Sequence, residues 1–407
     1  MAERRLLVRD IAQLATPAGR TAPLRGALGG RLDVVEDAFV LCEDGRIAAV
    51  GPMRELGRLD AEVPELDARG LCALPGFIDC HTHPAFGGDR VEEFDLRARG
   101  ASYEELHAAG GGIMSTVRMT RALDAQGLRD RVERHAGWML AHGTTRFEGK
   151  SGYGLDRETE LRSLAAIRAA GGMPTWLGAH AVPPEFHDAS AYLDFAIEEV
   201  LPEASAVASA ADVFLERGAF DATQARRYLE ACRNAGLPLR LHGDQFTEAG
   251  AISLAIELGA RSVDHLEATG PDGVAMLAGS DVTGVLLPAS ALFLDRPMPP
   301  ARALVDAGAA IALATDFNPG SAFCESLPLV MALACTRLGL GPAEALAAAT
   351  VNAAHVLGEA DSRGRLAPGY AADVVLLDAP DWRYVAYHLG TENLAIVVRD
   401  GDVVWRR

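Results

Sequence analysis

The chain has 407 residues, of which 49% are hydrophobic and 23% charged, and its formal net charge is −18. This acidic excess argues against nucleic acid and membrane partners, because both are bound mainly through Lys and Arg. Residues 1–20 lack the apolar stretch of a signal peptide, and no run of ~18 apolar residues follows, so we expect a cytoplasmic protein without a membrane span.

Short strands are predicted near both ends of the chain. Residues 39–42 and 46–51 are apolar runs separated by Asp44-Gly45, which is a hairpin signal. The same pattern recurs near the C-terminus, at residues 372–377, 395–399 and 403–405. We expect residues 1–74 and 362–407 to form one small β-sandwich domain, although two separate β appendages would give the same pattern.

Eight short apolar runs alternate with helical segments between these ends. The helical segments, such as residues 156–170 and 222–234, carry apolar residues every three to four positions. The predicted strands cover residues 76–81, 144–148, 175–180, 212–216, 239–242, 262–265, 282–287 and 310–316. Eight such units predict an α/β fold, a (β/α)8 barrel of the TIM type over residues 75–361.

Most of these strands end on a histidine or a carboxylate. Strand ends are often polar simply because they meet water. In a barrel, however, the carboxyl ends of all strands converge on one face, where active sites are built. The strand-end residues are His81, Glu148, His180, Glu216, His242, His265 and Asp316.

His81-Thr82-His83 is the strongest local feature. Alternate residues of a strand point to the same face, so both imidazoles can bind one metal ion, with His242 and Asp316 as further ligands. Bound Zn²⁺ lowers the pKa of water to ~7. Asp316 is then suited to act as general base, and His265 to polarise a carbonyl or stabilise an oxyanion.

Longer motifs carry a resemblance to known enzymes. The stretch from Leu74 to His83, followed by Thr315-Asp316, resembles the amidohydrolase superfamily. More specific blocks resemble the imidazolonepropionase family, in order, from about residue 30 to the C-terminus. These blocks are residues 86–90, 100–103, 109–113, 150–155, 178–184, 242–246 and 315–321.

The resemblance implies one Zn²⁺ or Fe ion per subunit, bound by His81, His83, His242 and Asp316. It implies a homodimeric hydrolase that opens the ring of 4-imidazolone-5-propanoate with metal-bound hydroxide, giving N-formimino-L-glutamate in histidine degradation. Arg90 offers a guanidinium to the propanoate carboxylate. The other residues implied to contact this small-molecule substrate are Tyr153, His180, Gln245, Asn318, Gly320 and Ser321.

Gln245 helps to distinguish ring opening from deamination. Cyclic deaminases of the same superfamily typically carry Glu three residues after the third His, where it shuttles protons to the departing ammonia. Gln245 cannot do so, although it is implied to take part in catalysis and Glu248 is a substitute to consider. Ring opening is therefore preferred over the release of free ammonia, and the alternative to the imidazolone reaction is a deaminase or another cyclic amidase on the same barrel. A non-catalytic assembly protein is disfavoured, because none of the implied ligands is missing.

Lys150 follows the second predicted strand. Binuclear relatives bridge two metal ions with a carboxylated lysine, whereas the resemblance implies one ion here. We interpret Lys150 as a structural residue or as a local positive charge.

Overall fold

The structure is a computed structural model that describes residues 4–59, 62–100, 111–391 and 393–407. Residues 101–103 and 109–110 of the motif blocks named above lie outside the described residues. Within the described part of the chain, no helix has both the length and the apolar character needed to cross a bilayer.

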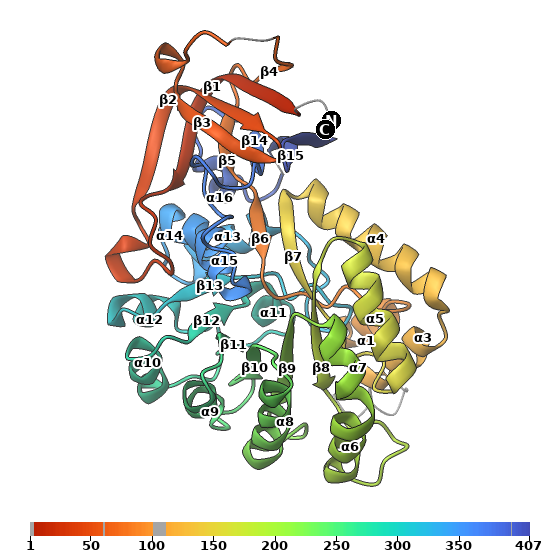
Figure 1. Cartoon of the computed structure of the whole chain (residues 1–407). Helices are drawn as coiled ribbons and strands as arrows, with labels where there is room; N and C mark the ends of the chain where they lie inside the picture. The colour runs from red at the N-terminus through yellow and green to blue at the C-terminus, as the bar shows by residue number, and fades with distance from the viewer. Residues whose placement is uncertain (1–3, 60–61, 101–110, 392) are drawn as a thin grey trace.

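Eight parallel strands form the predicted barrel, with each strand beside the next one along the chain (Figure 1). The prediction of an α/β barrel is confirmed, because each predicted run overlaps one of these strands. The strands are β6 (Phe77–Asp79), β7 (Thr144–Lys150), β8 (Met173–Ala179), β9 (Ala210–Leu215), β10 (Leu239–Gly243), β11 (Ser262–His265), β12 (Thr283–Leu286) and β13 (Ile311–Leu313).

Helices cover the outside of the barrel, so its strands are buried on both faces. Every residue of β10 and β12 is buried. The α-helices are α1 (Val91–Ala98), α3 (Ile113–Arg121), α4 (Ala125–Ala141), α5 (Arg157–Ala169), α6 (Ala189–Phe195), α7 (Leu201–Val207), α8 (Ala222–Asn234), α9 (Ala251–Leu258), α10 (Pro271–Ala278), α11 (Pro288–Phe293), α12 (Ala301–Ala307), α13 (Leu327–Arg337), α14 (Pro342–Ala348), α15 (Val351–Leu357) and α16 (Tyr384–Tyr387). Short turns of other helix types are η1 (Gly26–Leu28), η2 (Met53–Glu55) and η3 (Ala196–Val200).

The first and last barrel strands meet just beyond their carboxyl ends. The backbone N–H of Asp316 donates to the carbonyl of His81 at 3.0 Å. Thr315 Oγ1 donates to Asp79 Oδ2 at 2.6 Å, between positions 236 residues apart. We call these two contacts the barrel seam. The seam therefore lies beside the predicted metal ligands His81 and His83, which follow β6, and Asp316, which follows β13.

The two chain ends form one mixed sheet, drawn at the top of Figure 1. Its order is β16-β15-β14-β5-β1-β2-β3, with β4 beside β1. The strands are β1 (Arg5–Pro17), β2 (Leu32–Glu43), β3 (Arg46–Pro52), β4 (Glu65–Asp67), β5 (Cys72–Pro75), β14 (Val374–Leu377), β15 (Leu394–Arg399) and β16 (Asp402–Arg406). Because β14 pairs antiparallel with β5, one shared β-domain is confirmed over two separate appendages.

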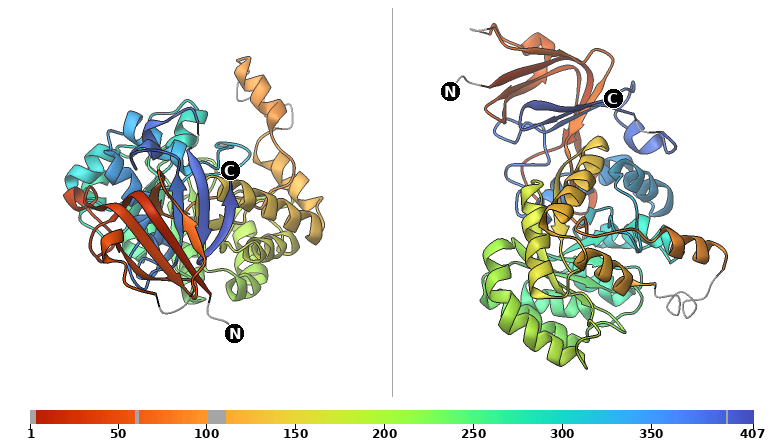
Figure 2. Two further views of the ribbon diagram at one scale, coloured as in Figure 1. Left: turned by 90° about the horizontal axis from the view of Figure 1, so that it is seen from above. Right: turned by 90° about the vertical axis from the view of Figure 1, so that its right-hand side faces the viewer.

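The terminal sheet is continuous in its hydrogen bonds, and its strands enclose a core to which both chain ends contribute. Val8 and Val40 from the N-terminal part pack in one cluster with Val374 and Val398 from the C-terminal part. The domain limits at residues 74 and 362 stay a prediction. Figure 2 shows this sheet stacked on one end of the barrel and α1 projecting from the barrel.

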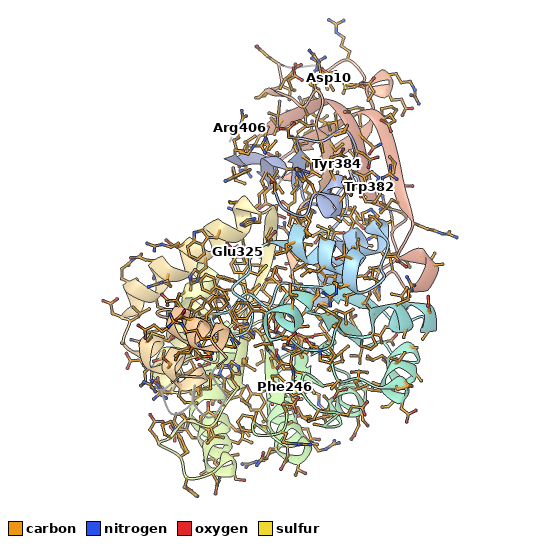
Figure 3. The ribbon with its side chains drawn as sticks, turned by 180° about the vertical axis from the view of Figure 1, so that it is seen from behind. Asp10, Phe246, Glu325, Trp382, Tyr384 and Arg406 are labelled. Atoms are coloured by element: carbon orange, nitrogen blue, oxygen red, sulfur yellow. The ribbon has the colours of Figure 1, made fainter. Side chains whose placement is uncertain are left out.

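Figure 3 shows the back of the molecule. Trp382 and Tyr384 lie where the terminal sheet meets the barrel, whereas Phe246 lies on the part of the barrel farther from that sheet. Phe246 follows β10, whose carboxyl end therefore faces away from the terminal sheet. The carboxyl ends of the barrel strands, where the sequence predicts the active site, thus lie at the end of the barrel opposite the terminal sheet.

Candidate active site

Three imidazoles and a carboxylate meet at the carboxyl ends of the barrel strands. His81 Nε2 and His83 Nε2 lie 3.3 Å apart, and His242 Nε2 lies 3.3 Å from His83 Nε2. Asp316 Oδ1 is 3.4 Å from His83 Nε2 and 3.6 Å from His81 Nε2. All four side chains are at least 96% buried. The structure therefore brings together the four predicted ligands from three separate segments.

The donor set fits a divalent metal ion. His81, His83 and His242 each offer a ring nitrogen within 4.8 Å of the others. In a second such set, His81 and His265 offer ring nitrogens and Asp316 offers a carboxylate oxygen. Burial lowers the pKa of His242 to about 4, and burial with the charge of Lys150 lowers the pKa of His81 well below its usual value. Neutral imidazoles whose lone pairs converge this closely repel one another unless a cation lies between them.

Two carboxylates face the outer nitrogens of these histidines. His81 Nδ1 is 2.6 Å from Asp264 Oδ2, and His242 Nδ1 is 3.1 Å from Asp212 Oδ2. A carboxylate at Nδ1 fixes the proton on that nitrogen, which leaves the Nε2 lone pair for the metal. Each imidazole is thus oriented by a carboxylate on the side of the ring opposite its Nε2 atom.

Lys150 joins these carboxylates in a charged layer beneath the imidazoles, which comprises Glu148, Lys150, Asp212, Arg240 and Asp264. Lys150 Nζ donates to Asp212 Oδ2 at 2.7 Å and to Glu148 Oε1 at 3.0 Å, and it lies 3.8 Å from Asp264 Oδ2. Arg240 Nη1 is 2.5 Å from Glu148 Oε1. Burial works against the charged ammonium, but Asp212 and Glu148 outweigh it and raise the pKa of Lys150. Lys150 is therefore a cation between carboxylates.

Asp316 is held by the loop that follows it. Ser321 Oγ donates to Asp316 Oδ2 at 3.2 Å, and Asn318 Nδ2 donates to the Asp316 carbonyl at 2.5 Å. Asn318 Oδ1 accepts from the backbone N–H groups of Gly320 and Ser321, at 2.8 Å each. Burial works to raise the pKa of Asp316, but the hydrogen bond from His83 and the charge of His265 lower it to about 2. Asp316 is thus an ionised, oriented acceptor.

His265 stands beside this cluster in a strained backbone. Its ring centroid is 5.6 Å from that of His81 and 5.3 Å from that of His242. His265 and the next residue, Leu266, have φ of 87° and 72°, in the left-handed region that non-glycine residues rarely adopt. Such strain persists where the surrounding structure fixes it, as at functional sites. Glu267 Oε1 lies 3.5 Å from His265 Nδ1.

Tyr153 and His180 line the other side of His83. The ring centroids of Tyr153 and His180 are 6.0 Å and 5.7 Å from that of His83. His180 Nδ1 is 3.0 Å from the carbonyl of Gly152. Gly152 has φ of 99°, and a Cβ there would lie 2.8 Å from the carbonyl oxygen of Leu177, so this approach requires glycine. These two predicted contacts thus lie next to the proposed ligands.

Gln245 and Glu248 follow β10 on one loop. Gln245 is 8% exposed, and the loop beside it is fixed by Glu216 Oε2, which accepts from the N–H of Phe246 at 2.8 Å. Glu248 Oε1 instead accepts from the N–H of Gly270 at 2.6 Å. Glu248 is therefore engaged at another loop, which weakens it as the substitute proton carrier considered from the sequence.

The charged layer is what sequence reasoning missed. Glu148 and Lys150 drew attention by their positions, but Asp212, Arg240 and Asp264 received no role. The sequence does contain a signal for them: a charged residue inside a strand that is buried on both faces needs a partner of opposite charge. Which partner it finds depends on the register between strands, which the sequence does not reveal.

The fold and the site define a class of barrel hydrolases, and the comparison with protein families agrees. A model described as the Amidohydrolase family matches residues 72–404, and the chain belongs to this family.

Within this family, the chain groups with the imidazolonepropionases. A protein of that name from Rubrobacter xylanophilus is 60% identical over 408 residues, covering 98% of each chain. Another, from Chloroflexus aggregans, is 47% identical over 418 residues, again with 98% of each covered.

Solved structures support the fold. Guanine deaminase from E. coli matches with a TM-score of 0.73 at 16% identity, over 99% of each chain. An adenosine deaminase from Xanthomonas campestris matches with a TM-score of 0.69 at 18% identity, over 98% of this chain and 92% of the other. Identities this low establish a shared architecture alone.

Proposed function

We propose that the protein is an imidazolonepropionase, which hydrolyses 4-imidazolone-5-propanoate to N-formimino-L-glutamate. The observation that carries the proposal is the buried cluster of His81, His83, His242 and Asp316 at the strand ends. Its support is the full-length similarity to relatives of that name. A divalent metal ion bound there would supply Lewis acidity, which makes water a nucleophile near neutral pH.

The reaction adds water across one ring C–N bond. The water oxygen bonds to the ring carbonyl carbon, the C–N bond breaks, and the ring nitrogen gains a proton. Asp316 accepts the proton from water and passes it to the departing nitrogen, which stays tethered in the product. His265 donates a hydrogen bond to the developing oxyanion.

The proposed substrate contacts surround this centre. Arg90 binds the propanoate carboxylate, and Tyr153 and His180 line the ring next to His83. The remaining contacts are Gln245, Asn318, Gly320 and Ser321. Gln245 orients the substrate and carries no proton, which favours ring opening over the release of free ammonia.

The metal and the assembly state belong to the same proposal. The nitrogen and carboxylate donors suit Zn²⁺ and Fe²⁺ alike, so elemental analysis of the purified protein identifies the ion. We expect a homodimer in the cytoplasm, which light scattering after gel filtration and cell fractionation test.

A direct assay tests the reaction. The unstable imidazolone is generated enzymatically in the cuvette, and the purified protein is added with metal present. We expect the imidazolone absorbance to fall and formiminoglutamate to appear in equal amount. Release of ammonia from a panel of heterocycles, with the imidazolone left intact, would instead identify a deaminase and refute the proposal.

A further inference from the structure

Arg90 is already engaged along one edge of its guanidinium. Arg90 Nε donates to Glu93 Oε2 at 2.9 Å, and Nη2 donates to Oε1 of the same carboxylate. The exposed fractions of the two side chains are 16% and 13%, so this is a largely buried pair and not a solvated surface pair. Arg90 immediately precedes α1, and Glu93 lies in its first turn.

The other edge of the guanidinium faces the loop after Asp316. A Cβ on residue 320 would overlap Arg90 Nη1, so glycine is what allows the guanidinium to lie there. Burial raises the pKa of the Tyr153 hydroxyl, with Asp316 adding to the rise and Arg90 opposing it. Tyr153 therefore has Arg90 and Asp316 as charged neighbours, which places the guanidinium at the candidate active site.

Glu93 is itself fixed from two directions. Its Oε2 also accepts from the backbone N–H of Gly112 at 2.8 Å, just before α3 begins. Burial works to raise the pKa of Glu93, but the bonds from Arg90 and Gly112 lower it, so the side chain is ionised at neutral pH. Glu93 thus joins the start of α1 to the start of α3.

We propose that Glu93 is a positioning residue for recognition of the substrate carboxylate. A guanidinium has five N–H donors, of which Glu93 uses one on Nε and one on Nη2. The Nη1 hydrogens and the second Nη2 hydrogen remain, on the edge that faces Gly320, and they can donate to both oxygens of a second carboxylate. Fixing a long side chain before binding lowers the entropy cost of binding.

This proposal rests on the proposed function, in which Arg90 binds the propanoate. The same contact also allows the opposite role for Glu93, that of a competitor of the substrate. If Glu93 were a competitor for the fork that the substrate needs, its removal would tighten substrate binding. The two roles therefore differ in the sign of one measured change.

Glu93→Gln tests the sign. The amide keeps the size of the side chain and removes its charge. We expect KM for 4-imidazolone-5-propanoate to rise roughly tenfold, as for loss of one charged hydrogen bond, with kcat within about twofold of wild type. Glu92→Gln, an exposed neighbour on the same helix, is the matched control and should leave both constants unchanged. A fall in KM, or a KM equal to that of the control, would overturn the proposal.

A double variant separates positioning from a general structural role. Because Glu93 acts through Arg90, Arg90→Ala with Glu93→Gln should have the same KM as Arg90→Ala alone. A further rise in KM in the double variant would overturn the proposal.

Calorimetry keeps this test independent of turnover. We expect Glu93→Gln to weaken binding of 3-(imidazol-4-yl)propanoate and to leave binding of 4-propylimidazole, which has no carboxylate, unchanged. Equal weakening of both probes, or of neither, would overturn the proposal. Absence of imidazolone turnover in the wild-type protein would instead refute the proposed function.

Discussion

Lys150 is the residue on which the orientation of the candidate metal ligands depends. It contacts Asp212 and Glu148 directly and lies near Asp264, and Asp212 and Asp264 face the outer nitrogens of His242 and His81. One ammonium thus stabilises the charge of the carboxylates that orient two imidazoles. A buried carboxylate without such a cation would be driven to take up a proton.

Replacing Lys150 with Met should therefore affect both stability and metal binding. Loss of one partner from a buried ionic cluster costs about 3–5 kcal/mol, measured by urea unfolding. Zn²⁺ affinity, measured by competition with a chelator, should fall roughly 10–100-fold, as for other residues that support metal ligands. Arg226→Met removes an exposed ion pair with Glu257 and should change neither quantity. Unchanged Zn²⁺ affinity in the Lys150→Met protein would contradict this role.

Asp316 should be required for the chemical step. Asp316→Ala removes the proposed proton acceptor and one metal ligand, so kcat should fall by at least 10²–10⁴-fold, the usual contribution of a general base. Asp316→Asn keeps the shape of the side chain and should be comparably inactive. Circular dichroism checks that both variants fold, and a folded, active Asp316→Asn protein would contradict the assigned role.

Residue types and strand-end positions were enough to predict the imidazole cluster. His81 and His83 come just after β6, His242 lies in β10 and Asp316 follows β13, and the barrel brings these strand ends together. The pairing of Arg90 with Glu93 was not predicted, because nothing in the sequence indicates that α1 begins at Val91 and places the two side chains within reach. Contacts between side chains require the helix start and the strand register, which are set by tertiary packing.

The elements of the barrel were predictable because each strand is a short apolar run between helical segments. The helices predicted at residues 156–170 and 222–234 correspond to α5 and α8, and both are capped by an aspartate, Asp156 and Asp221. The pairing of β14 with β5 could only be inferred from similar composition at the two chain ends. Distant strand pairing leaves no local periodic signal.

Helix α4 carries a buried histidine that should make stability depend on pH. His135 Nδ1–H donates to the carbonyl of Pro84 at 2.8 Å, and its ring stacks on Phe86 with centroids 4.4 Å apart. Burial lowers the pKa of His135 from 6.5 to about 4. The unfolded chain therefore binds more protons than the folded protein between these values, so stability falls as pH drops from 6.5 to 4.

Urea unfolding across this range measures the effect. His135 should account for up to about 3 kcal/mol of the stability lost on acidification. His135→Gln should reduce the slope of stability against pH, whereas His187→Gln, at a side chain that is 81% exposed, should leave it unchanged. An identical slope in the wild-type and His135→Gln proteins would contradict the assignment.

At the scale of the whole molecule, the net charge of −18 favours cations and opposes an anionic substrate. Lys150 is paired with the carboxylates around it, so we expect capture of the propanoate to depend on Arg90 and on a metal ion bound at the candidate site. Long-range attraction between the protein and its substrate is therefore absent. Raising the ionic strength should leave kcat/KM unchanged or increase it, and a marked decrease would contradict this view.

Metal removal should destabilise the entire barrel. His81 and His83 follow the first barrel strand, whereas Asp316 follows the last, so an ion bound by all three connects both sides of the seam. At a free metal concentration ~1,000 times its Kd, binding to the folded state adds about 4 kcal/mol of stability. Chelation should therefore lower the melting temperature, and re-addition of Zn²⁺ should restore it. A melting temperature unaffected by chelation would contradict this coupling.

The barrel seam also bears on how the protein is made. Asp79 and Thr315 are hydrogen-bonded across 236 positions, so this closing contact can form only after both residues have been synthesised. A nascent chain that has emerged from the ribosome only as far as β12 carries all three histidines and lacks Asp316. The complete centre therefore forms late in synthesis, after nearly the whole barrel has been translated, and a prematurely terminated chain carries only part of it.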